Sequence, residues 1–313
     1  MKKLIFFNQF HNGDCFVGKQ YVASMVSQLL MTPSGVNVDF AYAHNNHPNI
    51  IQDLEMNYKM EHLSLNNIPP MDRMTRVAES QDKETIFVNT WVGCWQGTMF
   101  PFGEHINFQR LHNIWREYFK YFNLEFIEDP DYYLPTIDFE SGAFDLSGAK
   151  SFLDNTEHFI LICNGSANSG QSRVGNLIQT INILAEDLKT SRLKYKIVCT
   201  EKFDTPHDNV IFTSDIFGNK ESDLNLIAYI STEAKLIVGK NSGPFSYCQF
   251  KDNLLDKDRT FLNLSILPTD CPSGGGAYPA RCIFSPETNE ERIANMINNI
   301  LQYPHLRGTE TLI

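Results

Sequence analysis

The stretch that decides the fold, residues 235–248, reads KLIVGKNSGPFSYC. Its apolar first half predicts a buried strand, and a short polar turn follows. Pro244 suits the first turn of a helix, because the amide that proline lacks would have no partner there. Asn241 or Ser242 can cap this helix, and Gly243 lets another group approach the backbone closely. The stretch therefore predicts a strand, a tight turn and the start of a helix.

A helix start of this kind has two interpretations. Its unpaired amides and the positive end of the helix dipole form an anion-binding site. Lys240, just before the turn, can add a positive charge to that site, or it can be an ordinary solvated lysine. Without a ligand, the same turn is an ordinary connection of an α/β fold. The recurrence of similar turns elsewhere in the chain favours the anion site.

Strands alternate with helices along the whole chain, which predicts parallel sheets with helices on both faces. We expect the other strands at residues 4–7, 36–42, 85–88, 159–163, 196–199, 210–212, 260–264 and 281–284, and helices at 17–30, 48–60, 108–122, 174–188 and 224–234. Thr288 and Glu291 form a capping box for a last helix, which ends near Leu301. Residues 138–155 read as a connection between two halves. We therefore predict an α/β chain of two doubly wound, Rossmann-like domains, residues 1–150 and 151–313, facing a cleft. Ligands of such sheets bind at the carboxyl ends of the strands.

The composition is that of a globular protein, and it limits the partners. The 313 residues are 42% hydrophobic, and the formal net charge of −11 argues against nucleic acid or anionic membrane as a partner. Seven cysteines lie far apart without a CxxC pair, as free thiols do. No apolar run reaches 18 residues, so the sequence predicts no transmembrane segment. A reduced, cytoplasmic compartment fits best.

A second turn, GSANSGQSR at residues 165–173, follows a predicted strand and precedes a predicted helix. It nearly matches the phosphate-loop pattern G-x-x-x-x-G-K-[ST], but Gln171 replaces the lysine. The turn is either a phosphate cradle with a nearby cation or a glycine-rich connection. The candidate ligand-binding residues of this turn are Gly165, Ser169, Gly170, Ser172 and Arg173.

A third turn, after the first strand, contains Asp14. Its carboxylate can take a proton from a bound hydroxyl group, or it can simply cap the following helix. Asp129 and Asp131 form an Asp-x-Asp that could hold a divalent metal, although acidic turns around proline are common. His44 and His47 are expected on the surface, and the histidines and cysteines show no metal-ligand spacing.

With these residues in place, the second half resembles the nucleotide-sugar domain of a GT-B glycosyltransferase, nearest to the heptosyltransferase (ADP-heptose:lipopolysaccharide) type. The resemblance rests on the run IFTSD at 211–215, a helix at 223–234 and the stretch 235–248. That family shows Asp-Thr/Ser-Gly-Pro-x-His at this helix start, where the present chain has Asn241 and Ser246 in place of Asp and His. Gly13-Asp14 is similar to the family's first-turn Gly-Asp.

The resemblance implies an inverting, metal-independent glycosyltransferase of the hexosyl or heptosyl class, with a glycan or glycolipid acceptor, as in polysaccharide biosynthesis. It needs no cofactor, because the nucleotide sugar is a substrate. It implies that Asp14 is the base. The donor diphosphate would be held by Lys240, Asn241, Ser242, Gly243 and the 165–173 turn.

Three alternatives remain open on the sequence. A GT-B epimerase would use the same two domains on a nucleotide sugar without an acceptor. A protein with a degenerate phosphate loop would bind nucleotide through the 165–173 turn alone. A non-catalytic two-domain binding module would close on a small ligand. Acceptor-dependent release of nucleoside diphosphate distinguishes the transferase from all three.

Overall fold

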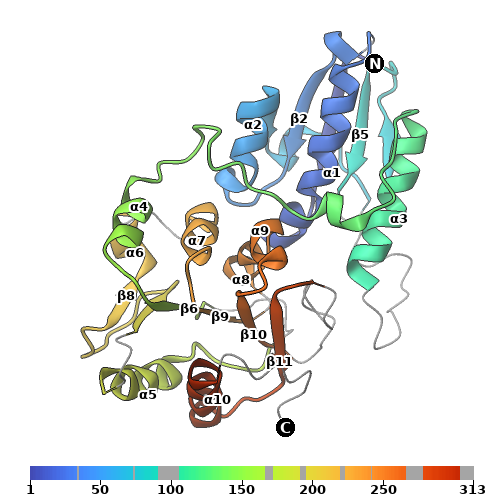
Figure 1. Ribbon diagram of the computed structural model, residues 1–313. Coiled ribbons are helices and arrows are strands. Elements are labelled where there is room, and N and C mark those ends of the chain that lie inside the picture. Colours follow the sequence, from blue (N-terminus) through green and yellow to red (C-terminus); the bar gives the residue numbers. More distant parts are fainter. Residues whose placement is uncertain are drawn as a thin grey trace. The chain divides into compact units, whose positions relative to one another are not determined.

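The computed structural model describes residues 1–33, 35–72, 75–90, 106–165, 172–190, 195–218, 223–240, 242–265 and 278–303. The chain divides into two compact units, Met1–Phe144 and Asp145–Ile313, each built on its own sheet (Figure 1). The predicted boundary after residue 150 lies inside helix α4 (Ser147–Asp154), which belongs to the second unit.

The first unit contains a five-stranded sheet in the order β3-β2-β1-β5-β4. All neighbouring strands run parallel except β4, which is antiparallel to β5. The apolar run at residues 4–7 forms the central strand and is almost completely buried. The strands are β1 (Lys3–Phe7), β2 (Asp39–Ala43), β3 (Glu61–Leu63), β4 (Val77–Glu79) and β5 (Thr85–Asn89).

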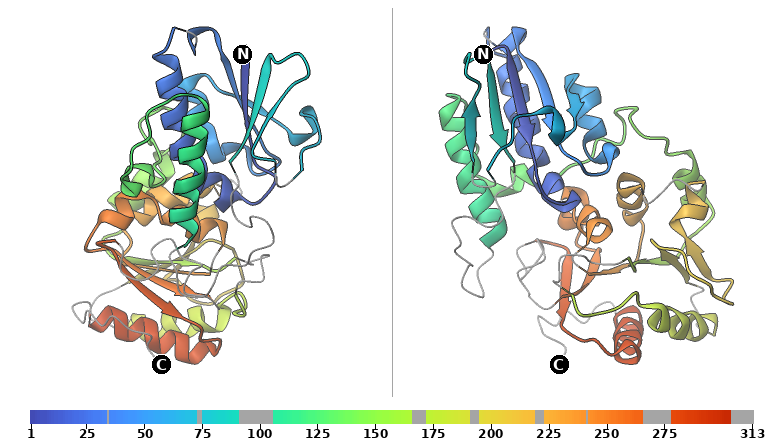
Figure 2. Two further views of the ribbon diagram at one scale, coloured as in Figure 1. Left: turned by 90° about the vertical axis from the view of Figure 1, so that its right-hand side faces the viewer. Right: turned by 180° about the vertical axis from the view of Figure 1, so that it is seen from behind.

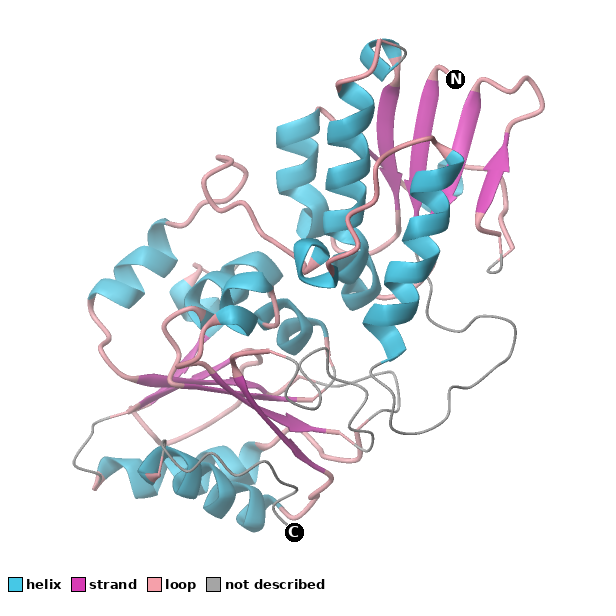
Figure 3. Cartoon of the chain, turned by 45° about the vertical axis from the view of Figure 1, so that its right-hand side comes forward, coloured by secondary structure: helices cyan, strands magenta, loops and turns pink. Residues whose placement is uncertain are grey.

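Helices α1, α2 and α3 lie on one face of this sheet (Figure 3). An aromatic stack joins α1 to α3 and to the segment around Tyr133, because the Tyr21 ring lies 5.2 Å from the Trp115 ring and 4.2 Å from the Tyr133 ring. The opposite face packs on the segment that contains Leu63, Leu65 and Met71. The helices are α1 (Asn12–Leu30), α2 (Gln52–Tyr58) and α3 (Ile106–Tyr121), with 3₁₀ turns at Gly35–Asn37, Pro48–Ile51, Leu65–Asn67 and Pro130–Tyr133.

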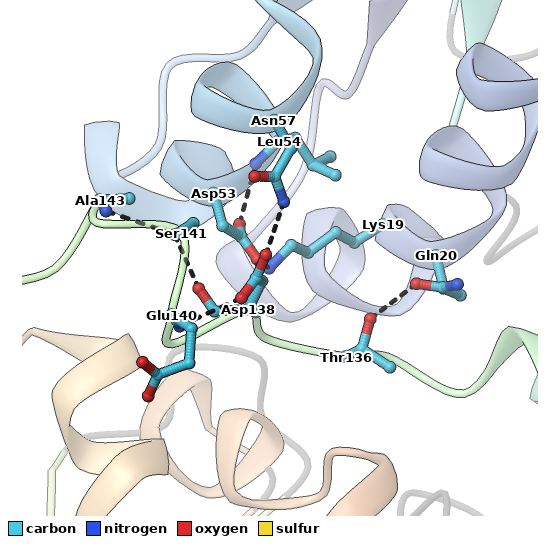
Figure 4. A network of polar contacts seen from close by, with 10 residues as sticks. All are labelled: Lys19, Gln20, Asp53, Leu54, Asn57, Thr136, Asp138, Glu140, Ser141 and Ala143. Atoms are coloured by element: carbon cyan, nitrogen blue, oxygen red, sulfur yellow. Dashed lines mark hydrogen bonds and ion pairs between the residues drawn. The ribbon is translucent and has the colours of Figure 1, made fainter.

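A buried ion pair holds α1 to α2 (Figure 4). Lys19 Nζ lies 2.5 Å from Asp53 Oδ2, and the two side chains are 2% and 4% exposed. The backbone N–H of Asp138 donates to the same carboxylate at 3.0 Å, and Thr136 Oγ1 donates to Gln20 at 2.6 Å. The last segment of the first unit is therefore fixed to both helices.

The second unit contains a parallel six-stranded sheet in the order β11-β10-β9-β6-β7-β8. Its strands are β6 (Phe159–Cys163), β7 (Lys196–Cys199), β8 (Val210–Phe212), β9 (Leu236–Gly239), β10 (Thr260–Leu264) and β11 (Arg281–Ser285). Besides α4, its helices are α5 (Ile178–Lys189), α6 (Thr213–Ile216), α7 (Leu224–Ser231), α8 (Gly243–Cys248), α9 (Lys251–Leu255) and α10 (Glu290–Gln302).

Helices cover both faces of this second sheet (Figures 1 and 2). The even-numbered side chains of β9 and β10, among them Val238 and Leu262, pack with α5 and α10 in one buried cluster. On the other face Phe245 of α8 packs edge-on against Phe261 of β10, with ring centroids 6.1 Å apart. The predicted fold class, α/β with two parallel-sheet units, is confirmed.

Helix α4 lies in the region that the sequence analysis interprets as a connection. Ala149 is 1% exposed, and a Cβ on Gly148 would collide with the Ile216 carbonyl. The Ser-Gly pair that resembled a linker therefore serves close packing of α4 against α6. Across the described part of the chain, none of the helices combines the length and apolar character needed to span a bilayer.

Candidate functional site

The deciding stretch forms strand β9 and helix α8, as predicted, at the centre of the second sheet. Gly239 ends the strand, and any Cβ there would collide with the Phe245 ring, so glycine is required for α8 to pack on the sheet. Ser242 is the N-cap residue, and its carbonyl accepts from Ser246 N–H at 2.9 Å. Asn241 lies outside the described residues. The turn thus stands at the carboxyl end of β9.

One of the predicted anion-binding amides already has a partner. The Ser242 N–H donates to the Lys240 carbonyl at 2.7 Å. The Ser242 hydroxyl, in contrast, is buried and has no hydrogen-bond partner among the described residues. Asn263 of β10, which pairs in register with Gly239, is 2% exposed and both polar atoms of its amide lack a partner within the described residues. Unpaired buried polar groups cost free energy, so this edge has hydrogen-bonding capacity to spare.

Lys240 differs from both interpretations of the sequence, because it is neither solvated nor directed at the helix start. Lys240 is 2% exposed, and its amine donates to the Gly175 carbonyl at 2.7 Å. Burial lowers the pKa of the lysine, and the charges of Glu201 and Glu290 oppose that shift. The amine therefore points towards the segment that precedes α5.

The phosphate-loop interpretation of residues 165–173 is wrong in one respect. Helix α5 begins at Ile178 and not at residue 174, so Ser172 and Arg173 do not lie at a helix N-terminus. Leu177, directly before the helix, is buried and has a left-handed backbone with φ of 60°, which interrupts any helix there. Arg173 is exposed, and it makes no hydrogen bond or ion pair with any residue that the structure describes. Ser169 and Gly170 are outside the described residues.

Glu201 is a candidate that the sequence analysis missed. It follows β7, and a Cβ on Gly165 would lie 2.6 Å from its Oε1 atom, so the carboxylate lies directly against the 165–173 turn. Asn164 holds it there: the Glu201 N–H donates to Asn164 Oδ1 at 2.8 Å, and Asn164 Nδ2 donates to the Glu201 carbonyl at 3.0 Å. In dinucleotide-binding folds an acid in this region accepts from the ribose hydroxyls. The signal in the sequence was an acidic residue two positions after the second strand of the second half.

In the first unit, Asp14 lies in the first turn of α1, which begins at Asn12, earlier than predicted. The His11 N–H donates to Asp14 Oδ2 at 3.1 Å, so the carboxylate does cap the helix. Asp14 is nevertheless partly exposed. Capping occupies one side of a carboxylate that has about four lone-pair sites, so it is compatible with a role as a base.

The loop before α1, which leads into Asp14, is fixed by hydrogen bonds to both backbone polar groups of Phe10. The Phe10 N–H donates to Asn8 Oδ1 at 2.9 Å, and its carbonyl accepts from Asn46 Nδ2 at 2.7 Å. Asn46 Nδ2 also lies 3.3 Å from the sulfur of Cys15. Burial raises the pKa of the Cys15 thiol to about 12, which excludes it as a nucleophile near neutral pH. Asp14 therefore remains the carboxylate candidate for the base in this turn.

His44 corrects a further expectation, because it is 1% exposed and not on the surface. Its Nδ1 accepts from the Asn46 N–H at 3.1 Å, which assigns the neutral tautomer. Burial, reinforced by the charge of His62, lowers the pKa of His44 to about 4. The folded state therefore resists protonation of this imidazole, and it loses stability as the pH falls from about 6.5 to about 4.

The contribution of His44 can be measured by urea unfolding. Between pH 7 and pH 5, we expect the shift to remove about 2 kcal/mol from the free energy of unfolding. His44→Gln lacks this titration, so its pH dependence should be weaker by that amount. The pKa of Glu55, raised by burial to about 7, acts in the opposite direction in both proteins and cancels in the comparison. Equal pH dependence in the two proteins would contradict the assignment.

The first aspartate of the Asp-x-Asp pair caps a 3₁₀ turn. Asp129 Oδ1 accepts from the Asp131 N–H at 3.0 Å and so caps the 3₁₀ turn Pro130–Tyr133. Within the described ranges, no three His, Cys, Asp or Glu side chains come close enough together to bind a metal ion.

Comparisons with known proteins identify the fold of the chain. No protein-family model matches the chain, and no curated protein matches its sequence. The heptosyltransferase WaaC of E. coli with ADP matches in structure with a TM-score of 0.50 and 9% identity, covering 96% of this chain and 99% of that one. WaaC with ADP-2-deoxy-2-fluoro heptose matches with a TM-score of 0.50, 8% identity and the same coverage. The chain thus has the GT-B fold of the heptosyltransferases, as the sequence resemblance predicts.

Proposed function

We propose that the chain is a glycosyltransferase that moves a sugar from a nucleoside-diphosphate donor to an acceptor hydroxyl group. The observation that carries this proposal is the carboxyl edge of the second sheet. There a carboxylate (Glu201), an unpaired hydroxyl (Ser242) and a segment with an exposed cation (Arg173) adjoin the ends of the central strands. The shared fold supports it, since WaaC is a heptosyltransferase whose structure contains ADP.

On the donor side, residues of the second unit bind the two parts of the nucleotide. Glu201 accepts hydrogen bonds from the ribose hydroxyls. Arg173, the Gly243 amide and the Ser242 hydroxyl hold the diphosphate, with Gly165, Ser169, Gly170, Ser172 and Asn241 in the same two turns. These groups stabilise the negative charge that grows on the diphosphate as it departs.

On the acceptor side, Asp14 acts as the base. The acceptor oxygen attacks the anomeric carbon from the face opposite the diphosphate, so the configuration inverts. The bond from that carbon to the diphosphate oxygen breaks, and its electron pair leaves with the diphosphate. The acceptor proton passes to the Asp14 carboxylate. The acceptor is a glycan or glycolipid, and the described cysteines are free thiols, which fits the cytoplasmic compartment inferred from the sequence.

A thermal-shift screen of the purified chain against nucleotide sugars tests the donor site. A specific donor at a hundredfold excess over its Kd should stabilise the fold by about 2.7 kcal/mol. Gly243→Val should keep the fold and lose most of this shift, because the added side chain blocks access to the amide. No shift with any nucleotide sugar, or an equal shift in Gly243→Val, would contradict this donor site.

Chelation tests the metal-independent mechanism. We expect turnover to survive an excess of EDTA, because Arg173 and the amides supply the positive potential that a metal ion would otherwise provide. The control is the same assay with Mg²⁺ or Mn²⁺ added back. Loss of turnover in EDTA that either ion reverses would instead make Asp129 and Asp131 the leading metal candidates.

A further inference from the structure

The segment 172–177 crosses the strand ends of the second sheet before α5 begins, and side chains tie it down at two points. Ser172 Oγ donates to the Leu264 carbonyl at the end of β10 at 2.9 Å. Lys240 Nζ donates to the Gly175 carbonyl at 2.7 Å. Leu177, fully buried, closes the segment. Arg173 lies between the two ties.

Lys240 is placed to hold this segment and not to meet a ligand itself. The residue is 2% exposed, whereas Gly175 is exposed and a Cβ there would have open space around it. The tie therefore runs from inside the sheet edge outward to a segment with few other contacts at that point. Burying the charged amine of Lys240 costs desolvation free energy, and the hydrogen bond to the Gly175 carbonyl offsets part of that cost.

We propose that Lys240 is a positioning residue that fixes the 172–177 segment so that Arg173 is held ready for the donor diphosphate. This inference rests on the proposed function. Without the tie, the segment samples more conformations, and ligand binding must order both it and the long Arg173 side chain. Fixing a loop in its bound conformation raises affinity by reducing that cost.

The test is a double-mutant cycle on nucleotide affinity. The probe is whichever of ADP, CDP, GDP and UDP binds the wild type most tightly by calorimetry. Lys240→Met keeps most of the length of the side chain and removes the donor. We expect Kd to rise about tenfold, because ligand binding must then order the segment and the Arg173 side chain. Lys235→Met, at the exposed amino end of the same strand, is the matched control and should leave Kd unchanged. Lys240→Arg keeps a donor and should restore most of the affinity.

Because Lys240 acts through Arg173, the two substitutions should not combine. In the Arg173→Gln background, Lys240→Met should change Kd by less than about twofold. A double variant whose Kd rises by the product of the two single effects would overturn the proposal, since Lys240 would then act independently of Arg173. If Lys240→Met does not fold, Lys240→Gln serves the same cycle.

Hydrogen exchange separates this inference from the proposed function. The amides of residues 174–177 should exchange faster in Lys240→Met than in Lys235→Met, with or without nucleotide. Unchanged exchange would overturn the positioning role even if the variant binds weakly. If the wild type binds none of the four nucleotides, the proposed function and the role of Arg173 fail, while the exchange rates still decide whether Lys240 fixes the segment.

Discussion

Asp14→Asn should lose about 10²–10⁴-fold in kcat while its affinity for the nucleotide sugar stays near that of the wild type. An acceptor hydroxyl is a poor nucleophile until its proton is removed as the new bond forms, and asparagine cannot take that proton. The proposed donor-binding residues all belong to the second unit, so the Kd of the donor should not change. Steady-state kinetics and calorimetry on the same preparations measure the two quantities.

This substitution also separates the base from the cap. Asp14 is the third residue after the N-cap His11, and the side-chain oxygen of asparagine can still accept from the His11 N–H. The substitution loses only the favourable charge at the helix N-terminus, about 0.3–1 kcal/mol. The stability of the variant should therefore be close to that of the wild type. Asp39→Asn, an exposed carboxylate at the amino end of β2, is the matched control and should keep full turnover. Near-wild-type turnover by Asp14→Asn would reduce Asp14 to a helix cap.

Asp53→Asn should lower the free energy of unfolding by about 3–5 kcal/mol, as is usual when one partner of a buried ion pair is removed. Lys19 is 2% exposed, so the substitution leaves its charge buried without its 2.5 Å partner (Figure 4). The Asp138 N–H keeps an oxygen acceptor in asparagine, so the charge is the main loss. Urea unfolding of the variant and the wild type measures the difference.

The exposed pair between Lys2 and Glu84 is the control for this effect. Their side chains are 75% and 47% exposed, so Glu84→Gln should lower the free energy of unfolding far less than Asp53→Asn does. Removing both charges, in Lys19→Met with Asp53→Asn, should recover most of the stability, because no unpaired charge remains and asparagine still accepts from the Asp138 N–H. A loss below about 1 kcal/mol in Asp53→Asn would show that Lys19 reaches water or another partner when Asp53 is neutral.

Hydrophobic patterning was enough to predict the alternating strands and helices, since apolar runs such as residues 159–163 are buried along their whole length. The strand, turn and helix start of the deciding stretch were predicted correctly, because Gly239 and Pro244 have narrow conformational and packing roles. These are local features, so a single sequence reveals them. The same alternation of strands and helices predicted the two α/β units.

The wrong or missed predictions concern features that depend on tertiary contacts. Helix α5 starts late because Leu177 adopts a left-handed backbone, which no helix propensity scale anticipates. Lys240 is buried because a carbonyl 65 residues away in sequence accepts its hydrogen bond. Glu201 approaches Gly165 only because β6 and β7 are neighbours in the sheet. His44 is buried by elements that come together in the fold. Long-range contacts of this kind leave no periodic signal in the sequence.

Acceptor-dependent release of nucleoside diphosphate tests the central claim most directly. The purified chain is incubated with the nucleotide sugar that stabilises it most, with and without a panel of glycan and glycolipid acceptors, and free diphosphate is measured. The account predicts that an acceptor raises the release well above the rate of donor hydrolysis, and that the sugar is recovered on the acceptor with inverted configuration. Conversion of the donor to another nucleotide sugar would contradict the account. So would binding of the donor without release of nucleoside diphosphate in the presence of any acceptor.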